Sequence, residues 1–359
     1  MALDRVVELA QASGLPTYKA NTVVALGGIM AMGIKLSVVS AHGFTVQSGL
    51  AEVRFLAIPV TAQGPQPEDG GISTGTDVQL SWRSGREAVT HDIAFSENLD
   101  AVVSGTAPVS TVTEDSYDAG VLNYNTTYYW QVTEVNEAAI PTAHVSDIWS
   151  FTTPDYDSLD DFESYSSKEG QEVFMSWVDG YSGDTSLGGS RTGHLDSPFV
   201  ETSIVKNGNK SMPIFYDNNG NFTDIDGNAS SPRFSAVMQG FESTRDFAKG
   251  DGEVLAVSFH GSPATGGIRG TNSGPDPLYL VVEDSTGKTV TVTHPDAAAV
   301  QINSWQDWLV PMSRFNSLEL SSIKSVTIGV GYPDGSQVGS EGILYIDDLR
   351  IGVPVPVTE

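Results

Sequence analysis

Short runs of alternating apolar and polar residues recur along almost the whole chain, and glycine, proline, asparagine, aspartate and serine separate them. A clear example is the run 76–82, in which Val78, Leu80 and Trp82 alternate with polar side chains. A period of two places one set of side chains on each face of a strand. A helical period occurs only over residues 2–12. The sequence therefore predicts an all-β protein.

The first 60 residues contain three strand patterns, at 22–26, 33–40 and 49–58. The last two, with Ile34-Lys35-Leu36-Ser37-Val38 followed by Gly49-Leu50-Ala51-Glu52-Val53-Arg54-Phe55, resemble the closing strands of a discoidin (F5/8 type C) domain. The resemblance implies the C-terminal half of a β-sandwich over residues 1–60. Half a sandwich exposes unpaired strand edges. We therefore expect either a fragment of a larger protein or a segment that packs on its neighbours or on another copy.

Residues 61–154 form a second predicted unit, which begins with a polar, proline-bearing linker at 61–69. Its strand patterns lie at 76–82, 91–95, 125–135 and 147–153. The unit resembles a fibronectin type III domain, an immunoglobulin-like sandwich. The matching residues are Leu80-Ser81-Trp82, Thr127-Tyr128-Tyr129-Trp130-Gln131-Val132 and Trp149-Ser150-Phe151-Thr152-Thr153. The resemblance implies a spacer, with Trp82, Trp130 and Trp149 in its core.

Residues 155–359 form the third and largest predicted unit. Strand patterns with almost no helical period fill it, and they predict a jelly roll. The residues 284–288 predict a hairpin turn. The strand candidates lie at 211–216, 234–238, 253–259, 278–284, 289–293, 306–312, 325–330 and 342–351.

Adjacent carboxylates lie at both ends of this third unit, in the stretches 159–165 and 342–351. The first and last strands of a closed two-sheet fold are commonly neighbours, which would bring these acids together. Two bare carboxylates about 4 Å apart repel by roughly 4 kcal/mol at an effective dielectric near 20, so such a cluster favours a hard cation, usually calcium. The alternative is a set of separate, solvated acids on two edge strands. The acids concerned are Asp160, Asp161, Glu163, Asp347 and Asp348.

The same unit resembles the jelly-roll carbohydrate-binding modules of polysaccharide-degrading enzymes. The matching residues are Asp161-Phe162-Glu163, Trp305-Gln306-Asp307-Trp308-Leu309-Val310-Pro311 and Leu344-Tyr345-Ile346-Asp347-Asp348-Leu349. The resemblance implies a structural calcium between the first and last strands, with Glu163 and Asp347 or Asp348 as ligands and Asp160 or Asp161 beside them. The whole chain also resembles the C-terminal tails of large secreted proteins of planctomycete-type bacteria.

Glycan binding needs an exposed aromatic ring for stacking and nearby hydrogen-bonding groups. Aromatic residues in polar, turn-like sequence are candidates, although each of them has core packing as its alternative. Trp305 and Trp308 are expected to face opposite sides of one strand, with at least one in the core. The Asp- and Asn-rich loop 217–228 is a sugar-contacting loop, a second calcium loop or a plain polar loop. The weak ligand-binding candidates are Trp177, Tyr181, Tyr216, Asp217, Asn218 and Tyr332.

Composition narrows the function classes. A formal net charge of −27 disfavours nucleic acid and anionic membrane surfaces as partners. The apolar stretch 23–34 is too short for a membrane helix, and the N-terminus shows no signal pattern. The six histidines are scattered without zinc-ligand spacing, and no nucleophile elbow or P-loop occurs.

We therefore expect a non-catalytic, extracellular or cell-surface, multi-module protein whose jelly roll binds a polysaccharide or glycan and a structural calcium. The alternative is a structural or adhesive surface or fibre component, in which modules and exposed strand edges bind one another. In that alternative the N-terminal segment contacts other copies or surface proteins. A third class, an enzyme with its active site in the jelly roll, requires a deep pocket with converging acids and a base.

Overall fold

The computed structural model describes residues 6–11, 22–26, 33–42, 49–50, 53–54, 59–262 and 274–354. They belong to two compact units. The first comprises residues 1–69, 80–117 and 128–150, and the second comprises residues 70–79, 118–127 and 151–359. The domain boundaries that we predicted after residues 60 and 154 stay a prediction.

The described residues before position 59 form neither helix nor strand. This contradicts the strands expected at 22–26 and 33–40, and also the helix expected over 2–12 where residues 6–11 are described. Val23 and Val39 are 89% and 82% exposed. These apolar side chains are therefore not buried, and burial does not stabilise a strand here. Most of the strand expected at 49–58 lies outside the described residues.

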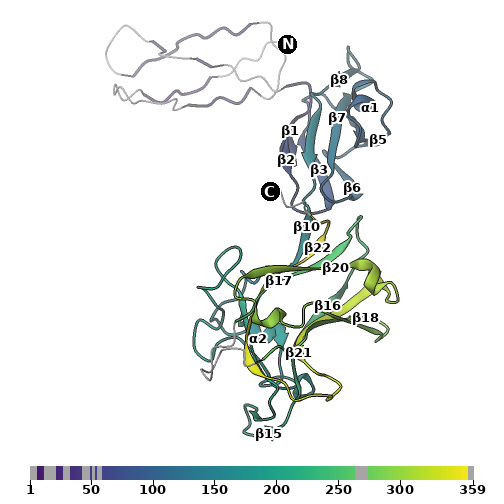
Figure 1. Ribbon diagram of the computed structural model, residues 1–359. Coiled ribbons are helices and arrows are strands. Elements are labelled where there is room, and N and C mark those ends of the chain that lie inside the picture. The colour runs from purple at the N-terminus through teal and green to yellow at the C-terminus, as the bar shows by residue number, and fades with distance from the viewer. Residues whose placement is uncertain are drawn as a thin grey trace. The chain divides into compact units, whose positions relative to one another are not determined.

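Two sheets occupy residues 63–152 (Figure 1). One has the strand order β1-β3-β6, and the other has the order β2-β9-β7-β4-β5 with β8 paired to β7. The elements are β1 (Gln63–Gln66), β2 (Gly71–Ile72), β3 (Asp77–Arg83), β4 (Thr90–Ser96), α1 (Leu99–Val103), β5 (Val109–Val112), β6 (Ser116–Val121), β7 (Thr127–Val135), β8 (Ala143–Val145) and β9 (Trp149–Thr152).

Tryptophans join these two sheets in the first unit. Trp82 on β3 contacts Trp130 on β7 edge-to-face, with ring centroids 6.0 Å apart, and Trp130 contacts Trp149 at 4.8 Å. All three are buried, which confirms the core role predicted for them. The fibronectin-like identity of this region stays a prediction.

The second unit contains the largest sandwich. Its elements are β10 (Tyr156–Asp160), α2 (Val173–Ser176), β11 (Trp177–Val178), η1 (Thr185–Leu187), β12 (Ser190–Thr192), β13 (Met212–Asp217), β14 (Phe222–Thr223), β15 (Ala229–Ser230), β16 (Phe234–Arg245), β17 (Val254–His260), β18 (Leu278–Asp284), β19 (Thr289–Thr293), η2 (Ala299–Gln301), β20 (Trp305–Pro311), η3 (Met312–Phe315), η4 (Leu320–Ser322), β21 (Ile323–Gly331) and β22 (Glu341–Gly352).

Two antiparallel sheets enclose one core in this sandwich. The six-stranded sheet has the order β12-β13-β22-β17-β20, with β10 paired to β22, and the five-stranded sheet has the order β11-β16-β21-β18-β19. The chain is thus all-β with tandem sandwiches, as predicted. The first and last strands of this sandwich pair, with Asp160 opposite Leu349, which confirms that they are neighbours. The hairpin predicted at 284–288 joins β18 and β19.

Alternation along the strands gives the six-stranded sheet two different faces. Ile214 and Tyr216 on β13 belong to the core, whereas Phe215 points to the opposite side, which we call the outer face. Trp308 likewise belongs to the core and Trp305 lies on the outer face, which confirms that these two tryptophans face opposite sides. Among the described residues, no helix has the length and apolar character that crossing a membrane requires.

Candidate functional site

Three rings form a continuous row on the outer face of the six-stranded sheet. His260 on β17 lies opposite Trp305 on β20 and opposite Tyr345 on β22. Both neighbours contact the imidazole edge-to-face, with centroids 5.6 Å apart for Trp305 and 5.9 Å for Tyr345. We call these residues the aromatic row. The row crosses the strands, which are about 4.8 Å apart.

The three rings differ in their access to solvent. Trp305 and His260 are partly exposed, and Tyr345 is only 8% exposed. The Nδ1 atom of His260 is buried and has no hydrogen-bond partner among the residues that the structure describes. Burial and the nearby Glu201 carboxylate raise the pKa of Tyr345, so its hydroxyl stays protonated at neutral pH. The row therefore combines ring surface with polar atoms.

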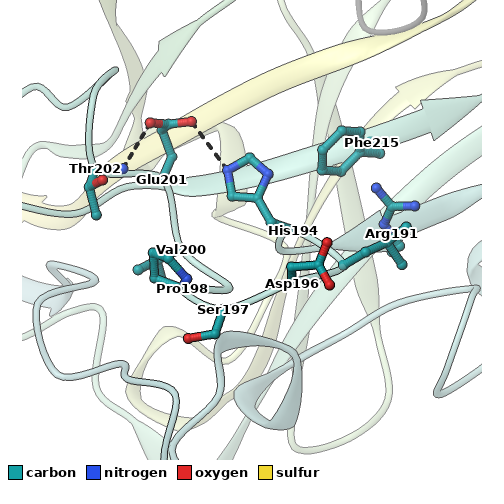
Figure 2. Close-up of a pocket in the computed structure, with 10 residues that line it drawn as sticks. Arg191, His194, Asp196, Ser197, Pro198, Val200, Glu201, Thr202 and Phe215 are labelled. Atoms are coloured by element: carbon teal, nitrogen blue, oxygen red, sulfur yellow. Dashed lines mark hydrogen bonds and ion pairs between the residues drawn. The ribbon is translucent and has the colours of Figure 1, made fainter.

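A pocket of about 420 Å³ lies beside the row, at the β12 edge of the sheet. Arg191 on β12 and Phe215 on β13 line one side, and the segment 194–202, which we call the edge loop, lines the rest (Figure 2). The Arg191 guanidinium lies 4.1 Å above the Phe215 ring centroid, and the His194 ring contacts the same phenyl edge-to-face at 5.8 Å. We call this cavity the edge pocket.

Several hydrogen bonds fix the position of Glu201 in the edge pocket. Its Oε2 atom lies 3.2 Å from His194 Nε2, and its Oε1 atom accepts a hydrogen bond from the Thr202 N–H (Figure 2). The same Oε1 atom also accepts from the Ser203 N–H. Burial opposes ionisation of Glu201, but the hydrogen bonds from Ser203, Thr202 and His194 outweigh it, so the pKa of Glu201 lies below its ordinary value. Glu201 is therefore a fixed, ionised acceptor.

A charged cluster lies on the same face, two residues along each strand from the aromatic row. Asp307 on β20 accepts hydrogen bonds from Lys206 Nζ and from Ser258 Oγ, and Arg350 lies 3.5 Å away. Lys206 Nζ also donates to Ser258 Oγ at 3.0 Å. Burial opposes ionisation of Asp307, but Lys206, Ser258 and Arg350 outweigh it and lower its pKa. These groups satisfy one another.

The hydrogen bonds of Asp160 differ from those of the other predicted calcium ligands. Asp160 Oδ2 accepts hydrogen bonds from Tyr165 (2.5 Å), Trp177 (2.8 Å) and Gln239 (3.0 Å), and Asp160 Oδ1 accepts one from the Phe162 N–H. Side-chain donors therefore fill the carboxylate from inside the sandwich. Asp160 thus serves as a structural acceptor, and its assignment as a calcium ligand stays a prediction. Asp161 is exposed, and its carboxylate accepts only from the Glu163 N–H.

The remaining three predicted ligands contact one short segment, residues 206–210. Glu163 Oε1 accepts hydrogen bonds from the N–H groups of Asn209 and Lys210, both at 2.8 Å. Asp347 Oδ2 accepts from the N–H groups of Lys206 (3.0 Å) and Asn207 (3.3 Å). Asp348 accepts from the Asn207 side chain.

N–H donors thus hold these carboxylates. In the part of the chain that the structure describes, no three acidic or histidine side chains converge as metal ligands. Burial nevertheless raises the pKa of Asp347 to about 6, and Asp348 adds to the rise. A cation in contact with this buried carboxylate would favour its ionised form.

Two of the predicted sugar-contacting aromatics are in the core, which corrects their assignment. Trp177 is 0% exposed and Tyr216 is 2% exposed, so neither presents a ring face to a ligand. Asn218 is also fully buried, where its amide donates to Asp276 Oδ2 (2.9 Å) and to the Val330 carbonyl (3.0 Å). This asparagine connects loops and is no ligand group.

The other three weak candidates are partly exposed, and they do not belong to the aromatic row. Tyr181 contacts Phe222 edge-to-face at 6.4 Å beside the β14–β15 hairpin. Tyr332 follows β21, in the other sheet. Asp217 ends β13 and accepts a 3.3 Å hydrogen bond from the Asn219 N–H. Nothing in the structure tests whether they bind a sugar.

Sequence reasoning missed His260, Tyr345, Phe215 and the edge pocket. Each aromatic residue occupies a position in its strand that alternates with core residues, which is a visible signal. The pairing of strands far apart in the sequence, which brings His260 beside both Trp305 and Tyr345, is not visible in a single sequence. The aromatic row can therefore be recognised only when the pairing register of these strands is known.

No protein-family model and no curated protein sequence matches this chain. Among solved structures, the chain is similar to an exo-β-agarase, with 14% identity and a TM-score of 0.36 over 55% of this chain and 26% of that chain. It is also similar to a structure of carbohydrate-binding modules from the β-sandwich superfamily, with 11% identity and a TM-score of 0.28 over 80% of this chain and 96% of that chain.

A third similar structure is the CBM22-1 xylan-binding domain of Paenibacillus barcinonensis Xyn10C, with 12% identity and a TM-score of 0.31 over 56% of this chain and 97% of that one. The chain spans about a quarter of the length of the agarase. Structures similar to this chain thus include carbohydrate-binding modules and an agarase, at identities and scores that leave the function to be argued from the site.

Proposed function

We propose that the sandwich of the second unit binds a polysaccharide or oligosaccharide on its outer face, without catalysing a reaction on it. The observation that carries the proposal is the aromatic row, in which Trp305, His260 and Tyr345 meet across three neighbouring strands. A sugar ring has apolar C–H faces that pack on aromatic rings, and its hydroxyl groups need fixed polar partners.

The row and the edge pocket offer both kinds of group. In the aromatic row, Trp305 and His260 supply partly exposed ring surface. In the edge pocket, Glu201 is a fixed acceptor close to His194.

Three further expectations belong to this proposal. The protein acts outside the cell or at the cell surface, and the region 61–154 serves as a spacer. A calcium ion stabilises the sandwich where Glu163 and the pair Asp347 and Asp348 hold the segment 206–210. Hard oxygen ligands are those that calcium prefers, and Asp160 and Asp161 are the further predicted ligands.

The alternative is assembly through exposed strand edges of the N-terminal segment. The described residues of that segment form no strand, so no observation favours this alternative over glycan binding.

Isothermal titration calorimetry of the full chain with xylan, agarose and cellulose oligosaccharides tests the proposal. We expect binding to at least one of them and a loss of at least about tenfold in affinity, or about 1.4 kcal/mol, in Trp305→Ala. The matched control is Tyr129→Ala, which removes a partly exposed ring on β7 in the first unit and should bind as the unchanged protein does. Absence of binding to these glycans and to a wider glycan array would overturn the proposal.

A further inference from the structure

The edge loop occupies the border of the outer face. β12 is the outermost strand of its sheet in the described part of the chain, and it has only three residues. After it, the Gly193 N–H still donates to the Pro213 carbonyl at 2.9 Å, and the chain then leaves the sheet. It returns at Glu201, which exchanges two 3.0 Å backbone hydrogen bonds with Ser211. The loop therefore lies along β13, where a further strand would otherwise pair.

Several contacts fix this loop in place. The His194 N–H donates to the Phe199 carbonyl at 2.7 Å and closes the loop on itself. Ser197 Oγ lies 2.6 Å from Ser167 Oγ, and Val200 is buried in the core. The hydrogen bonds that hold Glu201 fix its C-terminal end. The edge loop is therefore anchored at its start, middle and end, and it forms a fixed border of the edge pocket.

The aromatic row extends across the sheet towards the edge loop. Tyr345, at one end of the row, lies opposite Pro213 on β13. Phe215, two residues further along β13, is on the same face and lines the edge pocket. At the other end of the row, Trp305 begins β20, the opposite edge strand of the sheet. A path along the aromatic row thus ends at the edge pocket on one side and at the edge strand β20 on the other.

We propose, on the basis of the proposed function, that the edge pocket takes the terminal residue of a glycan chain, and that the preceding residues lie across the aromatic row. A site that binds the interior of a polysaccharide must let the chain leave at both ends, whereas the edge loop borders the path at one end, where its residues line the edge pocket together with Phe215. The volume of about 420 Å³ lies within the range of small-ligand sites and suits one or two sugar rings.

The groups in the edge pocket suit a chain terminus. A terminal sugar carries one more free hydroxyl than an internal residue, and that hydroxyl needs a partner. Glu201 accepts, His194 has a second ring nitrogen, and the Arg191 guanidinium, which lies over the Phe215 ring, also lines the pocket. The protein therefore recognises chain ends and binds each glycan chain once at the end that fits.

The stoichiometry of binding tests this inference. The glycan class that binds in the calorimetric screen is prepared as chains of short, intermediate and long length, and the full protein is titrated with each. We expect one protein molecule per glycan chain at every length. Binding whose stoichiometry increases with chain length would overturn the inference and leave the proposed function intact, whereas no binding at all would remove the proposed function itself.

A variant that fills the edge pocket gives a second, independent readout. Asp196 is exposed and lines the pocket, and its carboxylate makes no hydrogen bond to any residue that the structure describes, so Asp196→Trp fills space without removing such a contact. We expect its affinity for the shortest bound oligosaccharide to fall at least about tenfold. Glu114→Trp, in the exposed bend between β5 and β6 in the first unit, is the matched control. An unchanged affinity in Asp196→Trp would contradict the terminal-sugar assignment.

Discussion

Trp177 Nε1 donates a 2.8 Å hydrogen bond to Asp160 Oδ2 inside the second unit, and this one carboxylate oxygen also accepts from Tyr165 and Gln239. The arrangement joins the first strand of the sandwich, β10, to β11 and to β16. Burial and the Asp160 carboxylate raise the pKa of Tyr165, so its hydroxyl remains a donor. An acid that the sequence suggested as a metal ligand is the centre of a buried network.

Asp160→Ala is expected to lower the free energy of unfolding by at least about 2 kcal/mol. The buried donors of Trp177 and Tyr165 lose their acceptor, and each orphaned group costs about 1–3 kcal/mol. Urea denaturation of the full chain measures the change. Asp161→Ala, at the exposed neighbour, is the control and should change the stability by no more than about 0.5 kcal/mol. Equal effects in the two variants would refute the network.

Calcium is expected to stabilise the second unit. A ligand at about 100 times its dissociation constant adds about 2.7 kcal/mol to the native state, so the melting temperature should rise in calcium and fall in excess chelator. Glu163→Ala should remove the difference between the two conditions, and Glu169→Ala, at a nearby exposed glutamate, should preserve it. If the unchanged protein melts alike in both, the acids around 206–210 are ordinary hydrogen-bond acceptors.

The stability contributed by Asp284 is expected to disappear in acid. Its carboxylate accepts from Thr286, from the Lys288 N–H and from the Glu319 N–H, and these bonds lower its pKa to about 2. Because the folded pKa is below the unfolded value of about 3.9, the contribution is complete above about pH 4 and is lost as the pH falls towards 2.

The comparison of the unchanged protein with Asp284→Asn measures this loss. At pH 7 the variant should unfold at lower urea concentration, and the gap should narrow between about pH 4 and pH 2. Asp226→Asn, at an exposed turn acid whose carboxylate accepts no hydrogen bond in the structure, is the control and should show no gap. A gap that stays constant with pH would show that the carboxylate charge of Asp284 is not responsible.

Glu134→Ala is expected to destabilise the first unit strongly. Glu134 is buried, bonds the buried His91 and accepts a 2.8 Å hydrogen bond from the Gly85 N–H. Removal of one partner of a buried pair costs about 3–5 kcal/mol, because the other partner stays buried without it. Hydrogen exchange of the β4 and β7 amides should accelerate in this variant and stay unchanged in Glu137→Ala. Unchanged protection in Glu134→Ala would contradict the pairing.

The sequence predicted the fold of residues 63–352 well where burial enforces the pattern. Val78, Leu80 and Trp82 alternate because one face of β3 is buried, and the same reason applies to β7 and β13. The pattern failed at 22–26 and 33–40, where alternating apolar residues are exposed. Alternation shows that a strand has an apolar side, and it does not show that anything covers that side.

The candidate site was harder to predict than the fold. A single strand shows that Trp305 and Trp308 face opposite ways, and this prediction is confirmed. Whether His260 meets Trp305 depends on how β17 pairs with β20, and one residue of slip moves every side chain to the other face. The hydrogen-bond network around Asp160 was not predicted for a related reason, since two of its donors come from β11 and β16.

The position of β22 has a consequence for how the chain folds during synthesis. This strand is the last in the sequence, yet it pairs with β10, β13 and β17 in the middle of the six-stranded sheet. Until residues 341–352 leave the ribosome, β13 and β17 have no partner between them and expose edges that favour wrong pairing. We expect the sandwich to form late and slowly, because its central contacts join residues far apart in the chain.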